Sequence, residues 1–317
     1  MLGRLYGLAG VRPVLGAMFV VIAVMAPTAV AGQDFAEDPA AACSRPHLKD
    51  VAKVGQFIFK SYKSEDDGAC LQVIRDGKLI FRRTVDSREG YTLGQPGDQK
   101  SKIPAIANGT DITGRGHPDM IVSFYTGGAH CCTLHYVFEL EPKFKLLATL
   151  DARDTWPAYF ADLDRNQQYY YLAEDWTFAY WPGNFVSSPN APIVLQFVED
   201  AKGGKYHLAL DKMKKPAPTQ REWKDSLHDI SQGLIEYGDT ETTLAATLWN
   251  AVLKLIYSGD SDLAWRFLDE GWPKSREGKE DAFEYFCGTL KTSPYWPDLE
   301  PTLKNTPPAC ANAKPRR

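Results

Sequence analysis

The sequence lacks any long apolar run after its first 31 residues, and it has no excess of basic residues. A membrane-spanning helix needs about 20 apolar residues, so we expect no membrane insertion of the mature chain. With 36 Lys+Arg against 40 Asp+Glu the formal charge is −4, and this mild acidity argues against nucleic acid as a partner. The chain also has no G-x-S-x-G elbow, P-loop or H-E-x-x-H, so no motif indicates a reaction.

The first 31 residues have the pattern of a secretory signal peptide. Arg4 and Arg12 form a positive region, Val14–Pro27 is apolar, and Ala29–Ala31 is a small-residue cleavage site. A retained membrane anchor is the alternative, but the apolar part is shorter than the roughly 20 residues a span requires. We therefore expect cleavage before Gly32 and a periplasmic or secreted protein.

All six cysteines follow this segment, and an even number in an oxidising compartment predicts disulfides rather than thiol catalysis. Six cysteines allow 15 pairings. We favour Cys287 with Cys310, and Cys70 with one of Cys131 or Cys132. A ring between the adjacent Cys131 and Cys132 is the less favoured alternative.

Composition divides the mature chain into a β-rich part and a helical part. Short β-branched and aromatic runs alternate with turn residues before residue 211, whereas apolar residues recur at helical spacing after residue 221. We predict an α+β multidomain fold in which an antiparallel all-β domain precedes an α-helical domain. The predicted boundaries are 1–31 for the signal peptide, 32–53 for a lead-in segment that is a helix or a tail, 54–211 for the β domain, 212–220 for a linker and 221–310 for the helices.

The clearest hairpin is Cys70–Thr84, where Asp76-Gly77 is a type I′ turn pair between two apolar runs. Alternating apolar residues predict further strands at 120–125, 134–140, 145–150, 168–174, 192–197 and 205–210. Helices are predicted at Arg221–Tyr237, Thr242–Tyr257, from Ser261 as N-cap to Gly271, and at Lys279–Leu290. We expect these helices to form a packed bundle rather than a TPR-like array.

Two loops place oxygen-bearing side chains at alternate positions before a strand. The first loop carries Asp111, Thr113 and Asp119, and the second carries Asp162, Asp164 and Asn166. Both segments resemble the FG-GAP or VCBS repeat of integrin-like β-propellers, whose DxDxDGxxD loop holds calcium. The resemblance covers about residues 109–197 and implies a propeller-like β domain with these six residues as possible calcium ligands. The GGAHCC segment is also similar to a class of uncharacterised secreted bacterial proteins built around such repeats.

Both loops depart from the repeat pattern. In the first, Arg115 brings a positive charge to a ligand position; in the second, Gln167 replaces the glycine and Tyr170 the closing acid. A cation such as Ca²⁺ takes 6 to 8 oxygens, more than either loop supplies by itself. The alternative is an Asx turn, in which Asp and Thr side chains bond their own backbone.

His130, Cys131, Cys132 and His135 are ligand types for Zn²⁺ or copper, but we favour a disulfide with a packed histidine nearby. An acidic run lies among aromatic residues that could stack on sugars or fill the core between sheets. The acidic residues are Asp151, Asp154, Asp162, Asp164, Glu174 and Asp175. The aromatic residues are Trp156, Tyr159, Tyr169, Tyr170, Trp176, Tyr180 and Trp181.

These observations favour an exported non-catalytic protein that binds a protein or a glycan of the cell envelope, with loops that calcium could rigidify. The alternative is a cell-envelope glycan hydrolase that uses two carboxylates among Asp162, Asp164, Glu174 and Asp175.

Overall fold

The computed structural model describes residues 43–44, 47–64, 68–87, 89–128, 131–201 and 203–316, without the side chain of Cys131. The described residues belong to one compact unit. The predicted signal peptide and its cleavage before Gly32 lie outside the described residues, as does His130. Among the residues described, no helix has both the length and the hydropathy that crossing a bilayer requires.

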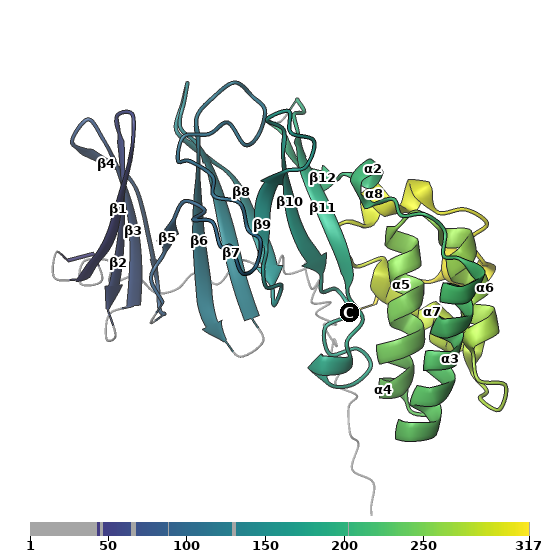
Figure 1. The fold of residues 1–317 in the computed structure, drawn as a ribbon. Coiled ribbons are helices and arrows are strands. Elements are labelled where there is room, and N and C mark those ends of the chain that lie inside the picture. The colour runs from purple at the N-terminus through teal and green to yellow at the C-terminus, as the bar shows by residue number, and fades with distance from the viewer. Residues whose placement is uncertain are drawn as a thin grey trace, which may run out of the picture. The chain divides into compact units, whose positions relative to one another are not determined.

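The β part consists of three antiparallel four-stranded sheets, and within each sheet the strands pair in the order of the sequence (Figure 1). The first sheet contains β1 (Leu48–Val54), β2 (Phe57–Ser64), β3 (Gly68–Arg75) and β4 (Lys78–Val85). The second contains β5 (Thr92–Leu93), β6 (Asp119–Gly128), β7 (Cys131–Glu139) and β8 (Lys145–Arg153). The third contains β9 (Tyr159–Asp162), β10 (Tyr169–Asp175), β11 (Ala191–Val198) and β12 (Lys205–Leu208). The predicted order, strands before helices, is confirmed.

Local sequence accounts for the best-predicted strands. Asp76 and Gly77 connect β3 and β4 with φ angles of 49° and 76°, the positive values that a type I′ turn requires. The lead-in segment differs from the prediction, because Leu48–Lys53 belongs to β1. This strand has an exposed, mixed sequence, so pairing with β2 rather than its own pattern determines its structure.

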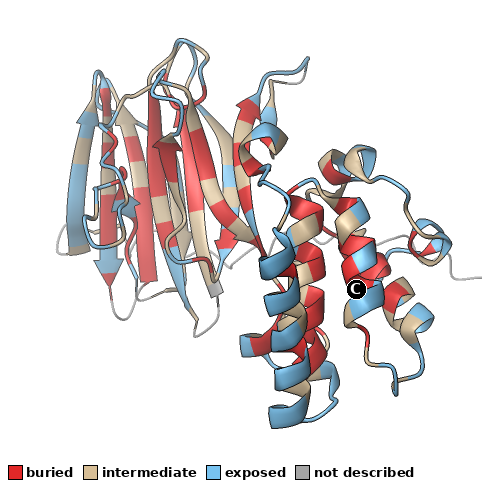
Figure 2. Ribbon diagram, turned by 45° about the vertical axis from the view of Figure 1, so that its right-hand side comes forward, coloured by how far each residue is buried: buried red, intermediate tan, exposed pale blue. Residues whose placement is uncertain are grey.

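The second sheet has a core on each face, because alternate side chains along a strand point to opposite sides. Met120 and Val122 pack with Phe59 of the first sheet. Ile121 and Val137 belong instead to the core that includes Phe160, Tyr171 and the helices. Figure 2 shows buried residues along the middle strands and on the inner sides of the helices. The second sheet is therefore held between the first and the third.

The helical part begins after β12 with α2 (Leu210–Met213), which spans the predicted boundary between the β domain and the linker, and α3 (Gln220–Tyr237). Thr219 caps α3 through a reciprocal capping box with Glu222. The remaining helical segments are α4 (Glu241–Leu244), the π-helical turn η3 (Ala245–Trp249), α5 (Asn250–Tyr257), α6 (Ser261–Gly271), α7 (Lys279–Leu290), α8 (Trp296–Leu299), the 3₁₀ turn η4 (Glu300–Thr302) and α9 (Pro308–Asn312). A further 3₁₀ turn, η2 (Phe185–Ser187), precedes β11.

The helix predictions are confirmed in position and corrected in two details. The predicted helix Thr242–Tyr257 is one helical stretch interrupted by the π turn of η3. Ser261 is the first residue of α6 rather than its N-cap, which is Asp260. The Ser261 hydroxyl accepts a hydrogen bond from the backbone N–H of Lys304 at 2.8 Å, so a distant segment uses the side chain that we assigned to capping.

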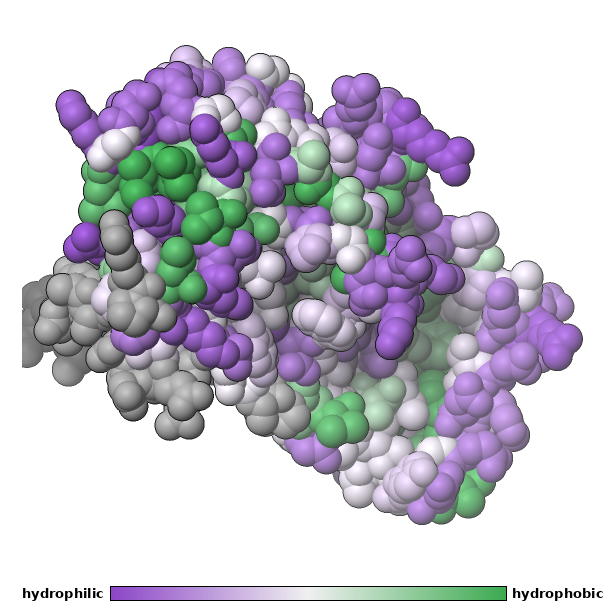
Figure 3. All heavy atoms as spheres, turned by 60° about the vertical axis from the view of Figure 1, so that its left-hand side comes forward, coloured by the Kyte–Doolittle hydropathy of each residue, from purple (hydrophilic) through white to green (hydrophobic). Residues whose placement is uncertain are grey.

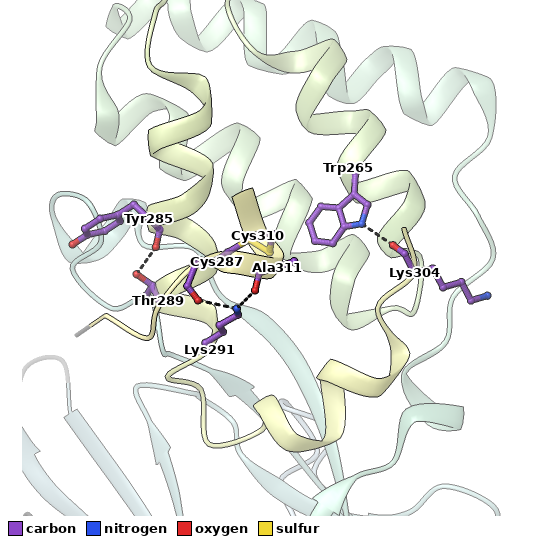
Figure 4. Close-up of a disulfide and its surroundings, with 9 residues drawn as sticks. Trp265, Tyr285, Cys287, Thr289, Lys291, Lys304, Cys310 and Ala311 are labelled. Carbon is purple, nitrogen blue, oxygen red and sulfur yellow. Dashed lines mark hydrogen bonds between the residues drawn. A yellow bond between two sulfur atoms is a disulfide. The ribbon is translucent and has the colours of Figure 1, made fainter. Parts of the chain in front are cut away.

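Two disulfides between described side chains close chain segments of similar length. Cys287 bonds to Cys310, as predicted, and joins α7 to α9 (Figure 4). Nearby, the Lys291 ammonium donates to the backbone carbonyls of Ala311 and Ala313. The predicted partner of Cys70 is wrong, because Cys70 bonds to Cys43. The alternative ring between Cys131 and Cys132 involves a side chain that the structure does not describe.

Candidate functional site

The first acidic loop folds around the carboxylate of Asp111. Its Oδ1 accepts hydrogen bonds from the backbone N–H groups of Gly114 at 2.8 Å and Arg115 at 3.1 Å, and its Oδ2 from Gly116 at 2.6 Å. Gly114 and Gly116 have φ angles of 73° and 78°, which glycine adopts at little cost. Asp111 therefore organises its own backbone, as the Asx-turn alternative requires.

Asp119 closes this loop from the start of β6 and is 2% exposed. Its Oδ2 accepts from the backbone N–H groups of Ile112 and Thr113 at 3.0 Å each and from the Thr113 hydroxyl at 2.9 Å. Its Oδ1 is buried and has no hydrogen-bond partner among the described residues. Burial, with a smaller contribution from Asp111, raises the pKa of Asp119 to about 7, because desolvation disfavours the ionised form.

The second loop repeats this arrangement around Asp162. Asp162 accepts from the backbone N–H groups of Asn166 at 3.1 Å and Gln167 at 2.8 Å. Arg165 and Gln167 have positive φ angles of 56° and 66°. The Asn166 side-chain oxygen accepts from the backbone N–H of Gln168 at 3.0 Å. The two loops therefore place their hydrogen bonds and their left-handed residues at equivalent positions.

The equivalence extends to the residue that closes each loop. In the first loop, the side chain eight positions after the leading aspartate, Asp119, bonds the Thr113 hydroxyl. In the second loop the corresponding Tyr170 donates its hydroxyl to Asp164 at 2.9 Å. Different side chains thus form a cross-loop contact at equivalent positions of the two loops.

Each loop lies beside a positively charged side chain. Lys212 of α2 donates to Asp164 Oδ1 at 2.7 Å and lies 5.5 Å from the ring centroid of Tyr170. This hydrogen bond raises the pKa of Lys212 to about 12. In the first loop Arg115 bonds Glu139 at 2.7 Å and Glu199 at 3.1 Å.

The loops offer unequal sets of metal ligands. Within the part of the chain that the structure describes, no group of three or more His, Cys, Asp or Glu side chains could hold a metal ion. The first loop supplies two carboxylates and a hydroxyl, with Asp119 Oδ1 still unbonded. In the second loop Asp164 already holds an ammonium. The first loop therefore keeps an unbonded carboxylate oxygen, whereas an ammonium engages the second loop.

His135 belongs to the second set of residues considered as metal ligands, and the structure places it in the core. Its Nδ1 lies 2.8 Å from the Tyr171 hydroxyl, and its ring contacts Phe160 edge-on. Burial lowers the pKa of His135 to about 4, because the interior disfavours the imidazolium form. His135 therefore joins the second sheet to the third as a neutral side chain.

Asp175, one of the candidate catalytic carboxylates, is 5% exposed and serves a structural contact. It accepts hydrogen bonds from the hydroxyls of Tyr257, Ser293 and Thr177. Two of these donors come from the helical part, so Asp175 anchors the helices to the third sheet. Asp162 and Asp164 are engaged as described above. Glu174 and Asp175 both line one cavity. Asp175 is held by its three hydroxyl donors, which leaves Glu174, whose pKa is raised by partial burial.

That cavity, the Tyr295 cleft, has a volume of about 340 Å³ and lies between β8, the third sheet and the segment before α8. Its lining includes Asp151, Arg153, Glu174, Trp176 and Tyr295. Burial, with the nearby carboxylates of Asp175 and Asp151, raises the pKa of Tyr295 above its usual value. The cleft therefore combines acidic and aromatic side chains around a phenol that stays protonated at neutral pH.

A second cavity, the Trp156 groove, has a volume of about 470 Å³ and is lined by side chains from the first and second sheets and the loop after β8. Trp156 is 80% exposed and Tyr125 is 43% exposed. The charged lining residues are Lys49, Glu89, Arg153 and Asp154, and the hydroxyl-bearing ones include Thr92, Ser123, Thr133 and Thr155. Because Arg153 also lines the Tyr295 cleft, the two cavities are neighbours.

The predicted aromatic group divides between core and surface. Trp181 is buried against Trp249 and Phe286, and Tyr170 is also buried. Trp176 stacks on Phe185 and donates its indole N–H to Thr155. Trp156 and Tyr180 are exposed at 80% and 59%. The core interpretation thus holds for part of the group, whereas Trp156 lines the Trp156 groove and Trp176 lines the Tyr295 cleft.

Sequence reasoning missed several groove and cleft residues, among them Lys49, Tyr125, Arg153 and Tyr295. They come from β1, β6, β8 and the segment before α8, far apart in the sequence. No motif in the sequence connects these residues.

Comparison with models of protein families, with curated proteins and with solved structures finds no match for this chain.

Proposed function

We propose that the protein is an exported, non-catalytic module that binds an extended glycan of the cell envelope in the Trp156 groove. The exposed indole of Trp156 is the observation that carries this proposal. A large aromatic side chain at 80% exposure keeps an apolar ring face in water, and such rings serve as anchors for ligands with both apolar and polar surfaces. A pyranose ring has that combination.

The charges of the groove favour an uncharged ligand. Lys49 and Arg153 are matched by Glu89 and Asp154, so the lining has no net charge. The threonine and serine hydroxyls between them can exchange hydrogen bonds with sugar hydroxyls, since each hydroxyl both donates and accepts. The neighbouring Tyr295 cleft, reached past Arg153, gives a longer chain a second place to bind.

The experiment is a calorimetric titration of the mature chain with N-acetylglucosamine hexamer, cellohexaose and purified peptidoglycan glycan strands. We expect one of these probes to bind, and Trp156→Ala to weaken that binding at least about tenfold. Tyr180→Ala is the matched control, because Tyr180 is exposed and is not among the groove residues. Binding of none of the probes, or equal affinity in the Trp156→Ala variant, would contradict the proposal.

We also propose that the β domain is built from FG-GAP/VCBS-like repeats and belongs to the propeller-like class. Three consecutive four-stranded meanders support this assignment, because the blade of a propeller is such a meander. The matched geometry of the Asp111 and Asp162 loops supports it independently.

In this proposal calcium binds the first loop and stiffens it rather than taking part in a reaction. Asp111, Thr113 and Asp119 would hold the ion, and the unpartnered Oδ1 of Asp119 supports the assignment. Thermal unfolding with excess Ca²⁺ and with chelator tests it: saturation at 100 times the dissociation constant stabilises by about 2.7 kcal/mol. Asp119→Asn should abolish the calcium-dependent rise in unfolding temperature. An unchanged rise in that variant, or no rise in the parent, would contradict calcium binding by the first loop.

Glycan hydrolysis remains the second candidate, on the strength of Glu174. Its pKa is raised by partial burial, and it lines the same cleft as Asp151; a general acid beside a second carboxylate has these features. Release of reducing ends from the same glycan probes, lost in Glu174→Gln, would support an enzyme. Binding without release supports the non-catalytic module.

A further inference from the structure

The first sheet presents one face to the core and the other to the outside. Phe59 and Val73 are fully buried on the inner face. Alternation along the strands therefore turns Ile58 and Ile74 outward, and the register places Lys53 beside Ile58 and Leu79 beside Ile74. We call this side, together with the exposed residues of β1 and β4, the outer face.

The outer face carries exposed aliphatic side chains. Leu48 and Val51 of β1 are 44% and 48% exposed, and Leu79 and Ile80 of β4 are 46% and 39% exposed. Figure 3 shows, at the upper left, a hydrophobic patch bordered by hydrophilic residues on the side where the first sheet comes forward. Single exposed aliphatics are common, but a group of them on one sheet marks an interaction surface.

The same four strands are strongly basic. They contain eight Lys or Arg residues and one acidic residue, Asp50. The segments between the strands add Glu65, Asp66, Asp67 and Asp76, so residues 48–85 together carry a balance of +3 in a chain whose formal charge is −4. Lys53, Lys60, Lys78 and Arg82 form no ion pair with any other described residue. The outer face therefore combines unpaired cations with exposed aliphatic groups.

We infer that the outer face docks on the surface of an anionic lipid bilayer. Unpaired lysines and arginines attract anionic headgroups, each contributing a several-fold increase in affinity, and aliphatic side chains enter the boundary between headgroups and acyl chains. A second copy of this chain fits less well, because an isologous contact would bring two basic faces together. Lys49 of β1 also lines the Trp156 groove, but the variants below leave Lys49 unchanged, so the inference is tested independently of the proposed function.

The test is co-sedimentation of the mature chain with vesicles of phosphatidylcholine and phosphatidylglycerol at 3:1, and with phosphatidylcholine vesicles. We expect binding to the anionic vesicles that weakens as salt rises, since exposed charges are screened. Leu79→Ser/Ile80→Ser and Lys53→Glu/Arg82→Glu should each lower the partition coefficient at least about tenfold. The charge-neutralising variant Lys53→Gln/Arg82→Gln should lower the partition coefficient by an intermediate amount. It replaces the charge-reversal variant as the test if that variant disturbs folding.

Matched controls come from surface residues of the helical part and of the turn η2. Val186→Ser/Ile235→Ser removes two exposed aliphatics, and Lys224→Glu/Lys314→Glu reverses two exposed charges; both pairs should bind vesicles as the parent does. Equal binding to both kinds of vesicle, or equal loss in controls and outer-face variants, would overturn the inference. So would dimerisation in place of vesicle binding, or equally tight binding to soluble polyglutamate.

Discussion

The ammonium nitrogen of Lys212 lies 2.7 Å from Oδ1 of Asp164, so a residue 48 positions further along the chain places a positive charge at the second loop. Asp211, the residue before it, also contacts this ammonium at 3.3 Å. The second loop therefore carries an ammonium group at the Asp164 carboxylate, a position that the resemblance to calcium-binding repeats assigns to a cation ligand. This contact also ties the beginning of the helical part to the third sheet.

Replacing Lys212 by methionine should therefore make the second loop responsive to calcium. The variant removes the ammonium from Asp164 Oδ1 and leaves this oxygen free to bind a cation, so we expect its unfolding temperature to rise more with Ca²⁺ than that of the parent. Differential scanning fluorimetry in Ca²⁺ and in chelator measures this. Lys215→Met, in the exposed stretch before α3, is the control. An identical calcium response in parent and Lys212→Met would show that the loop lacks ligands for another reason.

Gln167→Gly should stabilise the protein. Gln167 has a φ angle of 66°, and a left-handed conformation costs a residue other than glycine about 1 to 2 kcal/mol. Part of this gain is lost to the greater freedom of glycine in the unfolded chain, so we expect up to about 1 kcal/mol from urea denaturation. The reciprocal change at the equivalent position, Gly116→Ala, should destabilise by a similar amount, because its added Cβ meets open space and conformation alone acts. Destabilisation by Gln167→Gly, or stabilisation by Gly116→Ala, would contradict the equivalence of the two loops.

His135 should make the protein less stable in mild acid. Its folded pKa is about 4 against an ordinary 6.5, so between these values the unfolded chain binds a proton that the native state does not. Stability from this group is therefore complete above pH 6.5 and falls as the pH drops towards 4, by up to about 3 kcal/mol.

Asp119 acts in the opposite direction over part of this range, because its raised pKa gives the folded state the extra proton. The informative quantity is thus the difference between parent and His135→Gln in urea denaturation from pH 7 to pH 4. This difference should shrink as the pH falls, whereas His228→Gln, at an exposed position of α3, should follow the parent. A constant difference across the range would mean that His135 titrates normally.

Tyr257→Phe should weaken the attachment of the helices to the third sheet. The Tyr257 hydroxyl donates to the buried carboxylate of Asp175, and loss of a hydrogen bond to a buried charged group costs roughly 1.5 to 3 kcal/mol. Ser293 and Thr177 keep Asp175 partly satisfied, so the expected loss is near the lower value. Tyr237→Phe, at a tyrosine that is 69% exposed, is the control and should change the free energy of unfolding little. Equal effects of the two substitutions would rule out a specific role for this contact.

Local signals predicted much of the fold. The Asp76-Gly77 turn, the helix Gln220–Tyr237 and the boundaries of α7 follow from residues within a few positions of one another. The strand Leu48–Val54 was missed, because it has no clear alternation and gains its structure from pairing with β2. The π turn of η3 was also missed, since an apolar period of 3.6 residues continues through it.

The sequence by itself determined the order of strands and helices, the paired acidic loops and the presence of cysteines that can bridge, because these depend on backbone preferences and on near neighbours. Only the tertiary structure decided that Asp119 is desolvated, that Lys212 reaches Asp164, that Cys70 pairs with Cys43, and that Trp156 remains in solvent beside a groove while Trp181 is buried. Desolvation, charge pairing and exposure depend on which distant segments pack together, and a pattern along one stretch of chain does not contain that information.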